Sequence, residues 1–224
     1  MKKEMYREAG DGHAAIVLAE LEPYTRHHEF QPGFPGNSAL LVLDMQRYFL
    51  DPSSHAYLPT GEAIVPAVNA LASGFAAAGL PVFFSWHAYK KGEDAGALGR
   101  WWMDALDEKD PLAPLHPSIK VPVGAMHIRK TTYDMFDGTD LAEMLKEKGV
   151  RCVVAAGVMT HLCVETTARS AFVRGFDAVV PVDACATSNA ELHLSALRTL
   201  ADGFAVVCPS EEILSRLEKR EGVG

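Results

Sequence analysis

The feature that most constrains the fold is an alternation, from Ala39 onward, of short apolar runs with longer segments of helical periodicity. The apolar runs do not alternate polar with apolar residues, which is typical of strands buried on both faces. There are six such runs, at residues 39–43, 81–86, 126–129, 151–156, 178–182 and 205–208. This alternation predicts an α/β fold of three layers, α/β/α, with a six-stranded, mostly parallel sheet.

The segments between the runs carry helix signals. Residues 62–78 place apolar side chains on one helical face and end at Gly79, and segments 139–148 and 161–174 also end at a glycine. A glycine just past the last turn is a common helix terminator. Segment 90–123 is different, because it holds several glycines and prolines and is too long for a plain connection. We expect it to form either a lid over the site or a subunit contact.

The first 38 residues differ from the rest of the chain and are turn-rich near their end. We therefore divide the chain into an N-terminal extension, 1–38, and one α/β domain, 39–224. The apolar stretch 14–19 is expected to form a short helix that packs on a neighbour. Contact between subunits is the expected use of the extension, so we predict a homo-oligomer, a dimer or tetramer.

Composition excludes several classes of function. The net charge of −8 argues against nucleic acid or an anionic membrane surface as a partner, because both bind basic patches. No stretch approaches the roughly 20 apolar residues that span a bilayer, and the N-terminus lacks the apolar core of a secretion signal, so we expect a cytoplasmic protein. The 4 cysteines form no CxxC pair, which argues against disulfides and structural zinc.

Three reactive side chains, Asp44, Lys130 and Cys163, each follow a predicted strand. Ligands of an open parallel sheet bind beyond the carboxyl ends of its strands, so we expect these side chains to meet there. Cys163 lies near a predicted helix start, where free N–H groups favour a thiolate, and Lys130 would favour it further. We therefore expect a thiol pKa below its ordinary value, with Asp44 as proton acceptor.

Each of the three residues also has an ordinary structural interpretation. A cysteine in an apolar chain is commonly a buried packing residue, an aspartate after a strand is commonly a turn or cap residue, and a lysine is commonly a surface charge. The turn 157–163 adds backbone N–H groups that can face the nucleophile as oxyanion donors. The residues alone leave the catalytic and structural interpretations open.

Three ordered blocks carry a family resemblance. Residues 41–46 (LVLDMQ), residues 129–136 and residues 157–168 resemble the signature blocks of the isochorismatase-like cysteine hydrolases. The family includes nicotinamidases, N-carbamoylsarcosine amidases, ureidoacrylate amidases and isochorismatases. The resemblance covers about residues 39–214 and implies a Rossmann-like sheet with an Asp-Lys-Cys triad.

The resemblance implies specific residue roles. Cys163 corresponds to the nucleophile, Asp44 to the base and Lys130 to the third member of the triad. The family's cis peptide before the cysteine corresponds to Val158–Met159. The N–H groups of Met159 and Cys163 correspond to its oxyanion donors.

Two departures within the family narrow the expected reaction. Isochorismatases of siderophore pathways carry glycine where this chain has Cys163, so the cysteine favours hydrolysis of an amide, carbamoyl or ureido C–N bond through a thioester. Nicotinamidases carry a metal motif Asp-x-His, where this chain has Ser85 and His87 and no second histidine. We therefore expect no bound metal and no cofactor.

A small-molecule substrate is expected, and five side chains near the predicted mouth are predicted to bind it: Trp86, His87, Tyr133, Phe136 and His161. The pair Trp101 and Trp102 is expected instead in lid packing or a subunit interface. Two alternatives stay open. One is hydrolysis of a vinyl ether such as isochorismate, and the other is a non-catalytic oligomer that binds a ligand or senses oxidation through its thiol.

Overall fold

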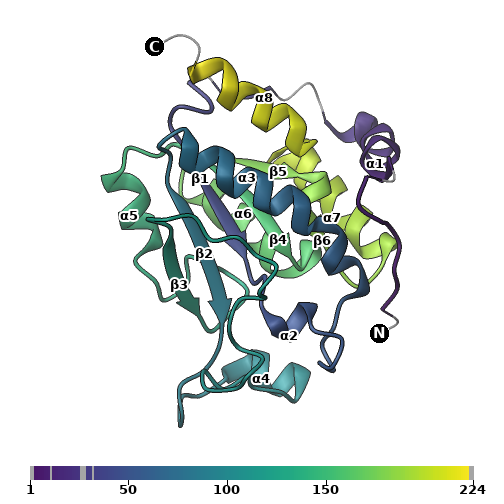
Figure 1. Cartoon of the computed structure of the whole chain (residues 1–224), viewed down its shortest axis with the longest axis vertical. Helices are drawn as coiled ribbons and strands as arrows, with labels where there is room; N and C mark the ends of the chain where they lie inside the picture. The colour runs from purple at the N-terminus through teal and green to yellow at the C-terminus, as the bar shows by residue number, and fades with distance from the viewer. Residues whose placement is uncertain (1–2, 11, 26–28, 32, 222–224) are drawn as a thin grey trace.

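A parallel β-sheet forms the centre of the molecule, with helices on both of its faces (Figure 1). The computed structural model describes residues 3–10, 12–25, 29–31 and 33–221. Within these residues the strands are β1 (Ser38–Leu43), β2 (Val82–His87), β3 (Met126–Lys130), β4 (Cys152–Val158), β5 (Asp177–Pro181), β6 (Cys185–Ala186) and β7 (Val206–Cys208). Their order is β3-β2-β1-β4-β5-β7, and β6 pairs with β4.

The predicted α/β fold is confirmed, while the predicted number of strands is one too low. Each of the six apolar runs forms a strand, and all pairings are parallel. The seventh strand, β6, has only two residues, and it pairs Cys185 with Gly157 and Ala186 with Val158 at the end of β4. Two residues are too few to show a periodicity, so the sequence pattern could not reveal this strand.

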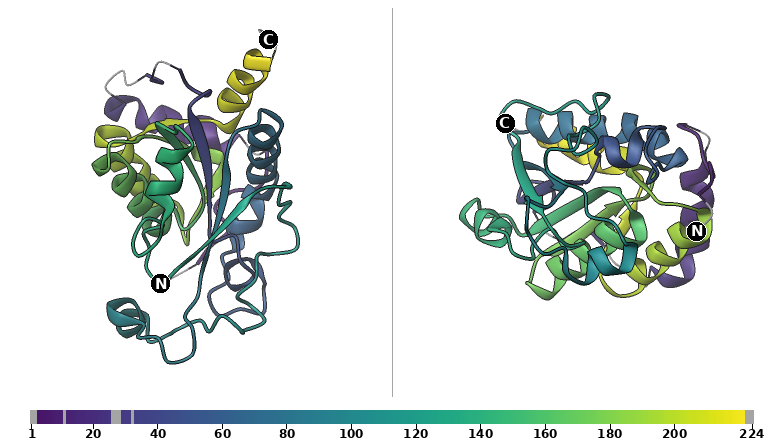
Figure 2. Two further views of the ribbon diagram at one scale, coloured as in Figure 1. Left: turned by 90° about the vertical axis from the view of Figure 1, so that its left-hand side faces the viewer. Right: turned by 90° about the horizontal axis from the view of Figure 1, so that it is seen from below.

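The helices divide between the two faces of the sheet, as the edge view in Figure 2 shows. The residues of α3 and α8 join one hydrophobic cluster, and those of α1, α5, α6 and α7 join the other. The helices are α1 (His13–Leu21), α2 (Arg47–Leu50), α3 (Val65–Ala77), α4 (Gly96–Trp102), α5 (Leu141–Glu147), α6 (Glu165–Val173), α7 (Ala190–Gly203) and α8 (Ser210–Glu221). None of the described helices is long and apolar enough to cross a membrane.

Strand β1 shows why the apolar runs do not alternate. It lies between β2 and β4, and all six of its residues are buried. Leu41 and Leu43 pack into one hydrophobic cluster, while Leu40 and Val42 pack into the other. Because successive side chains of a strand point to opposite faces, a sheet covered on both sides requires apolar residues at every position.

The N-terminal residues pack against their own chain. A helix forms in this region, as expected, but α1 buries Val17 and Leu21 in the same cluster as α7 of the same chain. The neighbour on which the helix packs is thus part of the same chain, and a contact between subunits through the extension stays a prediction. The division of the chain at residue 38 and the homo-oligomer both stay predictions.

Gly157 marks a close approach between β1 and β4. It pairs with Leu43 in register, has a φ of 115°, and would place a Cβ atom 2.2 Å from the carbonyl oxygen of Leu43. Both the positive φ and the contact require glycine. Asp44 follows Leu43 directly, so this contact sets the distance between the ends of the two strands at the edge where the reactive residues lie.

We expect Gly157→Ala to lower the free energy of unfolding by about 2–4 kcal/mol, because the added methyl group meets backbone atoms that cannot move aside. Guanidinium unfolding measures the change. The control is Gly203→Ala, where the helical glycine has open space around it and stability should stay the same or rise by up to about 1 kcal/mol. Equal stability of the two variants would contradict this account of the strand contact.

Candidate active site

The structure brings Asp44, Lys130 and Cys163 into contact at the carboxyl edge of the sheet. Asp44 follows β1, Lys130 is the last residue of β3, and Cys163 lies in a π-helical turn, η3 (Thr160–Val164), after β4. The Nζ atom of Lys130 lies 2.7 Å from Oδ2 of Asp44 and 3.4 Å from Sγ of Cys163. A carboxylate, an ammonium and a thiol therefore form one hydrogen-bonded group.

Each charged member of this group has further partners that hold it in place. The hydroxyl of Ser85 on β2 donates to Oδ1 of Asp44 at 2.7 Å and accepts from the Asp44 backbone N–H at 3.2 Å. Lys130 donates to the carbonyl of Thr132 at 2.9 Å. The ammonium thus forms an ion pair with the carboxylate and donates hydrogen bonds to the thiol sulfur and to this carbonyl.

The Asp44–Lys130 pair is fully buried, with both side chains at 0% exposure. Burial by itself lowers the pKa of Lys130, but the Asp44 carboxylate and Cys163 together raise the pKa above its ordinary value. The lysine is therefore a permanent ammonium at neutral pH. A buried ion pair of this kind is costly to break, because the remaining charge is left without a partner.

The thiol of Cys163 does not behave as its position in the sequence predicts. We expected a lowered pKa, whereas burial, followed by the charge of Asp44, raises the pKa of Cys163 to about 12. Lys130 acts in the expected direction, but it is outweighed. The resting site therefore holds a neutral thiol beside a carboxylate that can take its proton.

The turn that carries Cys163 is tied to neighbouring elements. The Val158–Met159 peptide bond is cis, and the carbonyl of Met159 accepts from the N–H groups of Leu162 and Val164 at 3.0 and 3.2 Å. Two side-chain bonds brace the turn from outside. Thr160 Oγ1 is 2.9 Å from Nδ1 of His193, and His161 Nδ1 is 2.6 Å from Oγ1 of Thr187.

His193 had no signal in the sequence. It lies on α7, fully buried, and burial followed by the charge of Arg7 lowers its pKa to about 3, so that its ring is neutral. The ring supports Thr160 from behind the turn. A single histidine on an otherwise ordinary helix gives no pattern that would associate it with Thr160.

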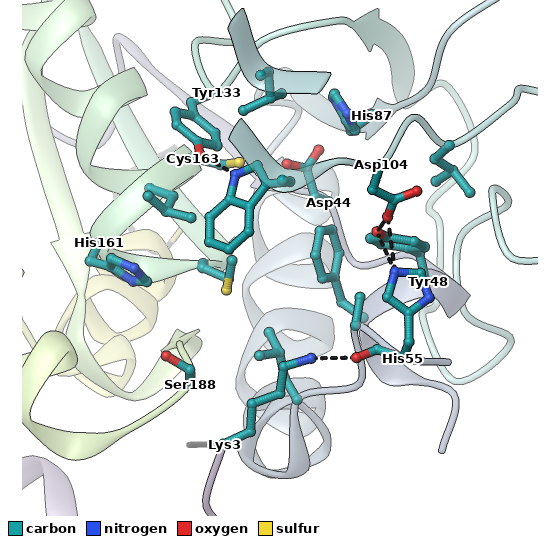
Figure 3. Close-up of a pocket in the computed structure, with 18 residues that line it drawn as sticks. Lys3, Asp44, Tyr48, His55, His87, Asp104, Tyr133, His161, Cys163 and Ser188 are labelled. Atoms are coloured by element: carbon teal, nitrogen blue, oxygen red, sulfur yellow. Dashed lines mark hydrogen bonds and ion pairs between the residues drawn. The ribbon is translucent and has the colours of Figure 1, made fainter. Parts of the chain in front are cut away.

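A cavity of about 250 Å³ opens beside the thiol (Figure 3). Asp44, Met159 and Cys163 lie on its wall, and side chains from distant parts of the chain complete it. The further contributors include Lys3, Tyr48, His55, Trp102, Asp104 and Ser188. The N–H groups of Met159 and Cys163 remain our prediction for the oxyanion donors.

The predicted substrate-binding residues divide into two groups. His87, Tyr133 and His161 line the cavity, whereas Trp86 and Phe136 do not. Neighbouring residues of a strand point to opposite faces, so Ser85 and His87 face the site and Trp86, between them, faces away. Phe136 is buried in the core, where its ring stacks on that of Phe176 at 6.0 Å.

The tryptophan of the cavity is Trp102, which belongs to segment 90–123. Its indole N–H donates to the hydroxyl of Tyr133 at 2.6 Å, and it stays 43% exposed. Leu98, Asp104 and Leu106 of the same segment also line the cavity, so the segment forms one of its walls. The neighbouring Trp101 is 79% exposed.

The residues around His87 do not fit a metal site. Burial, followed by the charge of Lys130, lowers the pKa of His87 to about 4, so its ring is neutral and could act as a ligand, but Ser85 beside it is not a carboxylate and uses its hydroxyl on Asp44. Among the described residues no group of three or more His, Cys, Asp or Glu side chains is arranged to hold a metal ion.

Known proteins resemble this chain over most of its length. The model of the isochorismatase domain matches residues 38–212. Nicotinamidase 3 of Arabidopsis thaliana is 36% identical over 196 residues, which are 84% of this chain and 94% of that protein.

Two solved structures share the fold. A cysteine hydrolase from Pseudomonas syringae pv. phaseolicola 1448A superposes with a TM-score of 0.81 at 24% identity, covering 85% of this chain and 96% of that one. The pyrazinamidase of Pyrococcus horikoshii, solved in complex with zinc, has a TM-score of 0.68 at 27% identity, covering 77% of this chain and 99% of that one.

We expect Lys130→Met to lower the free energy of unfolding by about 3–5 kcal/mol, because it leaves the Asp44 carboxylate buried without its partner. The double variant Asp44→Asn/Lys130→Met should recover part of the loss, and denaturant unfolding measures both. The control is Arg129→Met, which removes the more exposed ion pair with Glu93 and should cost no more than about 1 kcal/mol. A double variant less stable than Lys130→Met would contradict the pairing.

We expect Asp44→Asn to speed alkylation of Cys163 by iodoacetamide at pH 8 by at least about tenfold, because a one-unit fall in pKa raises the thiolate fraction tenfold. The substitution removes the anion that raises the thiol pKa and keeps Lys130 beside it. Mass spectrometry of the labelled peptide measures the rate, with Cys163→Ala as background. Slower or unchanged labelling would show that Asp44 does not hold the thiol protonated.

Proposed function

The chain belongs to the isochorismatase domain family, and from this premise we propose that it is a cysteine-dependent hydrolase of a small amide, carbamoyl or ureido compound. The observation that carries the proposal is the contact of a thiol, a carboxylate and a buried ammonium, with the thiol and the carboxylate on the wall of one cavity. Such a set supplies a nucleophile, a base and a fixed positive charge.

The first step is attack by Cys163. As Sγ forms a bond to the carbonyl carbon of the substrate, the thiol proton passes to the carboxylate of Asp44. The carbonyl oxygen takes up the negative charge, and the N–H groups of Met159 and Cys163 stabilise it. Because the resting thiol is neutral, proton removal and attack are coupled, and the site never has to hold a free thiolate.

The second step breaks the C–N bond. The tetrahedral intermediate collapses, the proton on Asp44 passes to the leaving nitrogen, and ammonia or an amine departs from the thioester. Water then attacks the thioester carbon while Asp44 takes a proton from it. Return of that proton to the sulfur releases the acid product and restores the thiol.

Lys130 remains a fixed positive charge beside Asp44 and Cys163 through both steps. Its ammonium bonds to Asp44 and Cys163, so it orients the carboxylate toward the sulfur and offsets negative charge on either one. The neutral rings of His87 and His161, whose pKa values burial lowers, add polar groups without adding charge. These rings suit the recognition of a neutral amide.

We expect Cys163→Ala to lower kcat/KM for ammonia release by at least about 10³-fold, as removal of a nucleophile does in other hydrolases. The assay is a panel of primary amides, carbamates and ureido acids. The control is Cys185→Ala, because this thiol is also buried but lies outside the cavity; its activity should stay near that of the wild type.

Two further readouts test the covalent step. Rapid quenching should trap a mass increase equal to the acyl group on the peptide that contains Cys163. Full activity of Cys163→Ala would sink the proposed mechanism. Release of pyruvate from isochorismate by that variant would favour the vinyl ether alternative.

A further inference from the structure

Residues 3–7, here called the N-terminal strap, cross the edge of the cavity. The backbone N–H of Glu4 donates to the carbonyl of Ser188 at 2.9 Å. Thr60 accepts from the N–H of Tyr6 at 3.1 Å and donates to the carbonyl of Glu4 at 3.0 Å. The strap therefore lies between two elements of the domain that are far apart in sequence.

The second half of the strap is anchored more deeply. The hydroxyl of Tyr6 accepts from the backbone N–H of Thr187 at 3.1 Å. Arg7 is buried and donates to the carbonyls of Val182 and Asp183 at 3.3 and 2.9 Å. Thr187 also bonds to His161, so the strap is linked to the turn that carries Cys163.

Lys3 is the member of the strap that lines the cavity (Figure 3). Its Nζ atom donates to the backbone carbonyl of His55 at 2.7 Å, which holds the solvent-exposed side chain across the mouth. Within the described chain Lys3 makes no ion pair. An ammonium has three N–H donors, so two of them remain available to a ligand.

The other charged groups of the cavity already have partners. Asp44 is paired with Lys130. Asp104 accepts hydrogen bonds from the hydroxyl of Tyr48 and from His55. His87 and His161 are kept neutral by burial, and Lys3 is a positive charge of the cavity mouth that has no ion pair among the described residues.

We propose that Lys3 binds a carboxylate at the end of the substrate remote from the scissile bond, so that the substrate class is small amides or ureides that carry an acid group. This inference rests on the proposed function, since it places the reacting carbonyl at Cys163. A single cation suits a monoanion, and the carboxylate of Asp104 on the same cavity disfavours a dianion such as phosphate.

Apolar side chains make up much of the remaining cavity wall. Phe49, Leu58, Met159 and Leu162 all contribute to the wall, together with the ring of Trp102. The expected substrate is therefore an amide and a carboxylate joined by a short apolar spacer. The family model begins at residue 38, so the strap lies outside the residues that it matches.

The test uses monoamides of straight-chain dicarboxylic acids from succinate to adipate, each compared with the aliphatic amide of the same chain length. For the wild type we expect a higher kcat/KM on the acid member of each pair. Lys3→Met should lower that value about 3- to 10-fold through KM, the size expected of one exposed charge contact. Its kcat/KM on the neutral amides should fall by a smaller factor, because these substrates have no carboxylate for Lys3 to bind.

Three controls make the result specific. Lys146→Met removes an exposed lysine from α5, outside the cavity, and should leave both substrate classes unaffected. Lys3→Arg should keep the preference for acids. Raising the ionic strength should lower kcat/KM for the acids in the wild type more than in Lys3→Met. An equal loss on acid and neutral amides in Lys3→Met would overturn the assignment.

A binding measurement separates this inference from the proposed function. Calorimetric titration of glutaric acid monoamide into Cys163→Ala, with and without Lys3→Met, should show the same 3- to 10-fold weakening, about the size of one exposed charge contact. Identical dissociation constants would overturn the role of Lys3 while leaving the cysteine mechanism intact. Ammonia release by Cys163→Ala itself would overturn the mechanism instead.

Discussion

The site depends on one buried salt bridge, between Asp44 and Lys130. Charges removed from water lose several kcal/mol of solvation each, so such a pair persists only where hydrogen bonds satisfy its remaining atoms. Here Ser85 bonds to the carboxylate, and the Thr132 carbonyl and the Cys163 sulfur accept from the ammonium. These partners come from different segments around the sheet edge. The positions of Asp44, Lys130 and Cys163 therefore follow from the need to give the buried carboxylate and the buried ammonium their polar partners.

The same burial determines the state of the nucleophile. Cys163 lies beside both members of the ion pair. The ammonium of Lys130 lowers the pKa of the thiol, but the carboxylate of Asp44 raises it and so opposes that effect. The pKa of Cys163 therefore rises with burial, despite its position near a helix. The proposed reaction uses this arrangement, since a neutral thiol beside an ionised carboxylate needs only one short proton transfer to become reactive.

The cavity wall combines side chains that lie at or just after strand ends with side chains from two other segments of the chain. His87, Tyr133 and His161 lie close in sequence to strand ends, and their presence in the wall follows from the sheet. Lys3 and Trp102 come from the N-terminal strap and from segment 90–123. In our proposal the sheet edge supplies the chemistry, while the strap, which lies outside the residues that the family model matches, selects the substrate through Lys3.

The sequence by itself determined the sheet and the edge on which the reactive residues meet. Apolar runs define strands, and parallel strands bring their carboxyl ends to one side, so Asp44, Lys130 and Cys163 were predictable from order alone. Tertiary structure alone decided that Trp102 lines the cavity in place of Trp86, that His193 supports the turn, and that the thiol stays protonated. These outcomes depend on burial and on neighbours distant along the chain, which local spacing does not encode.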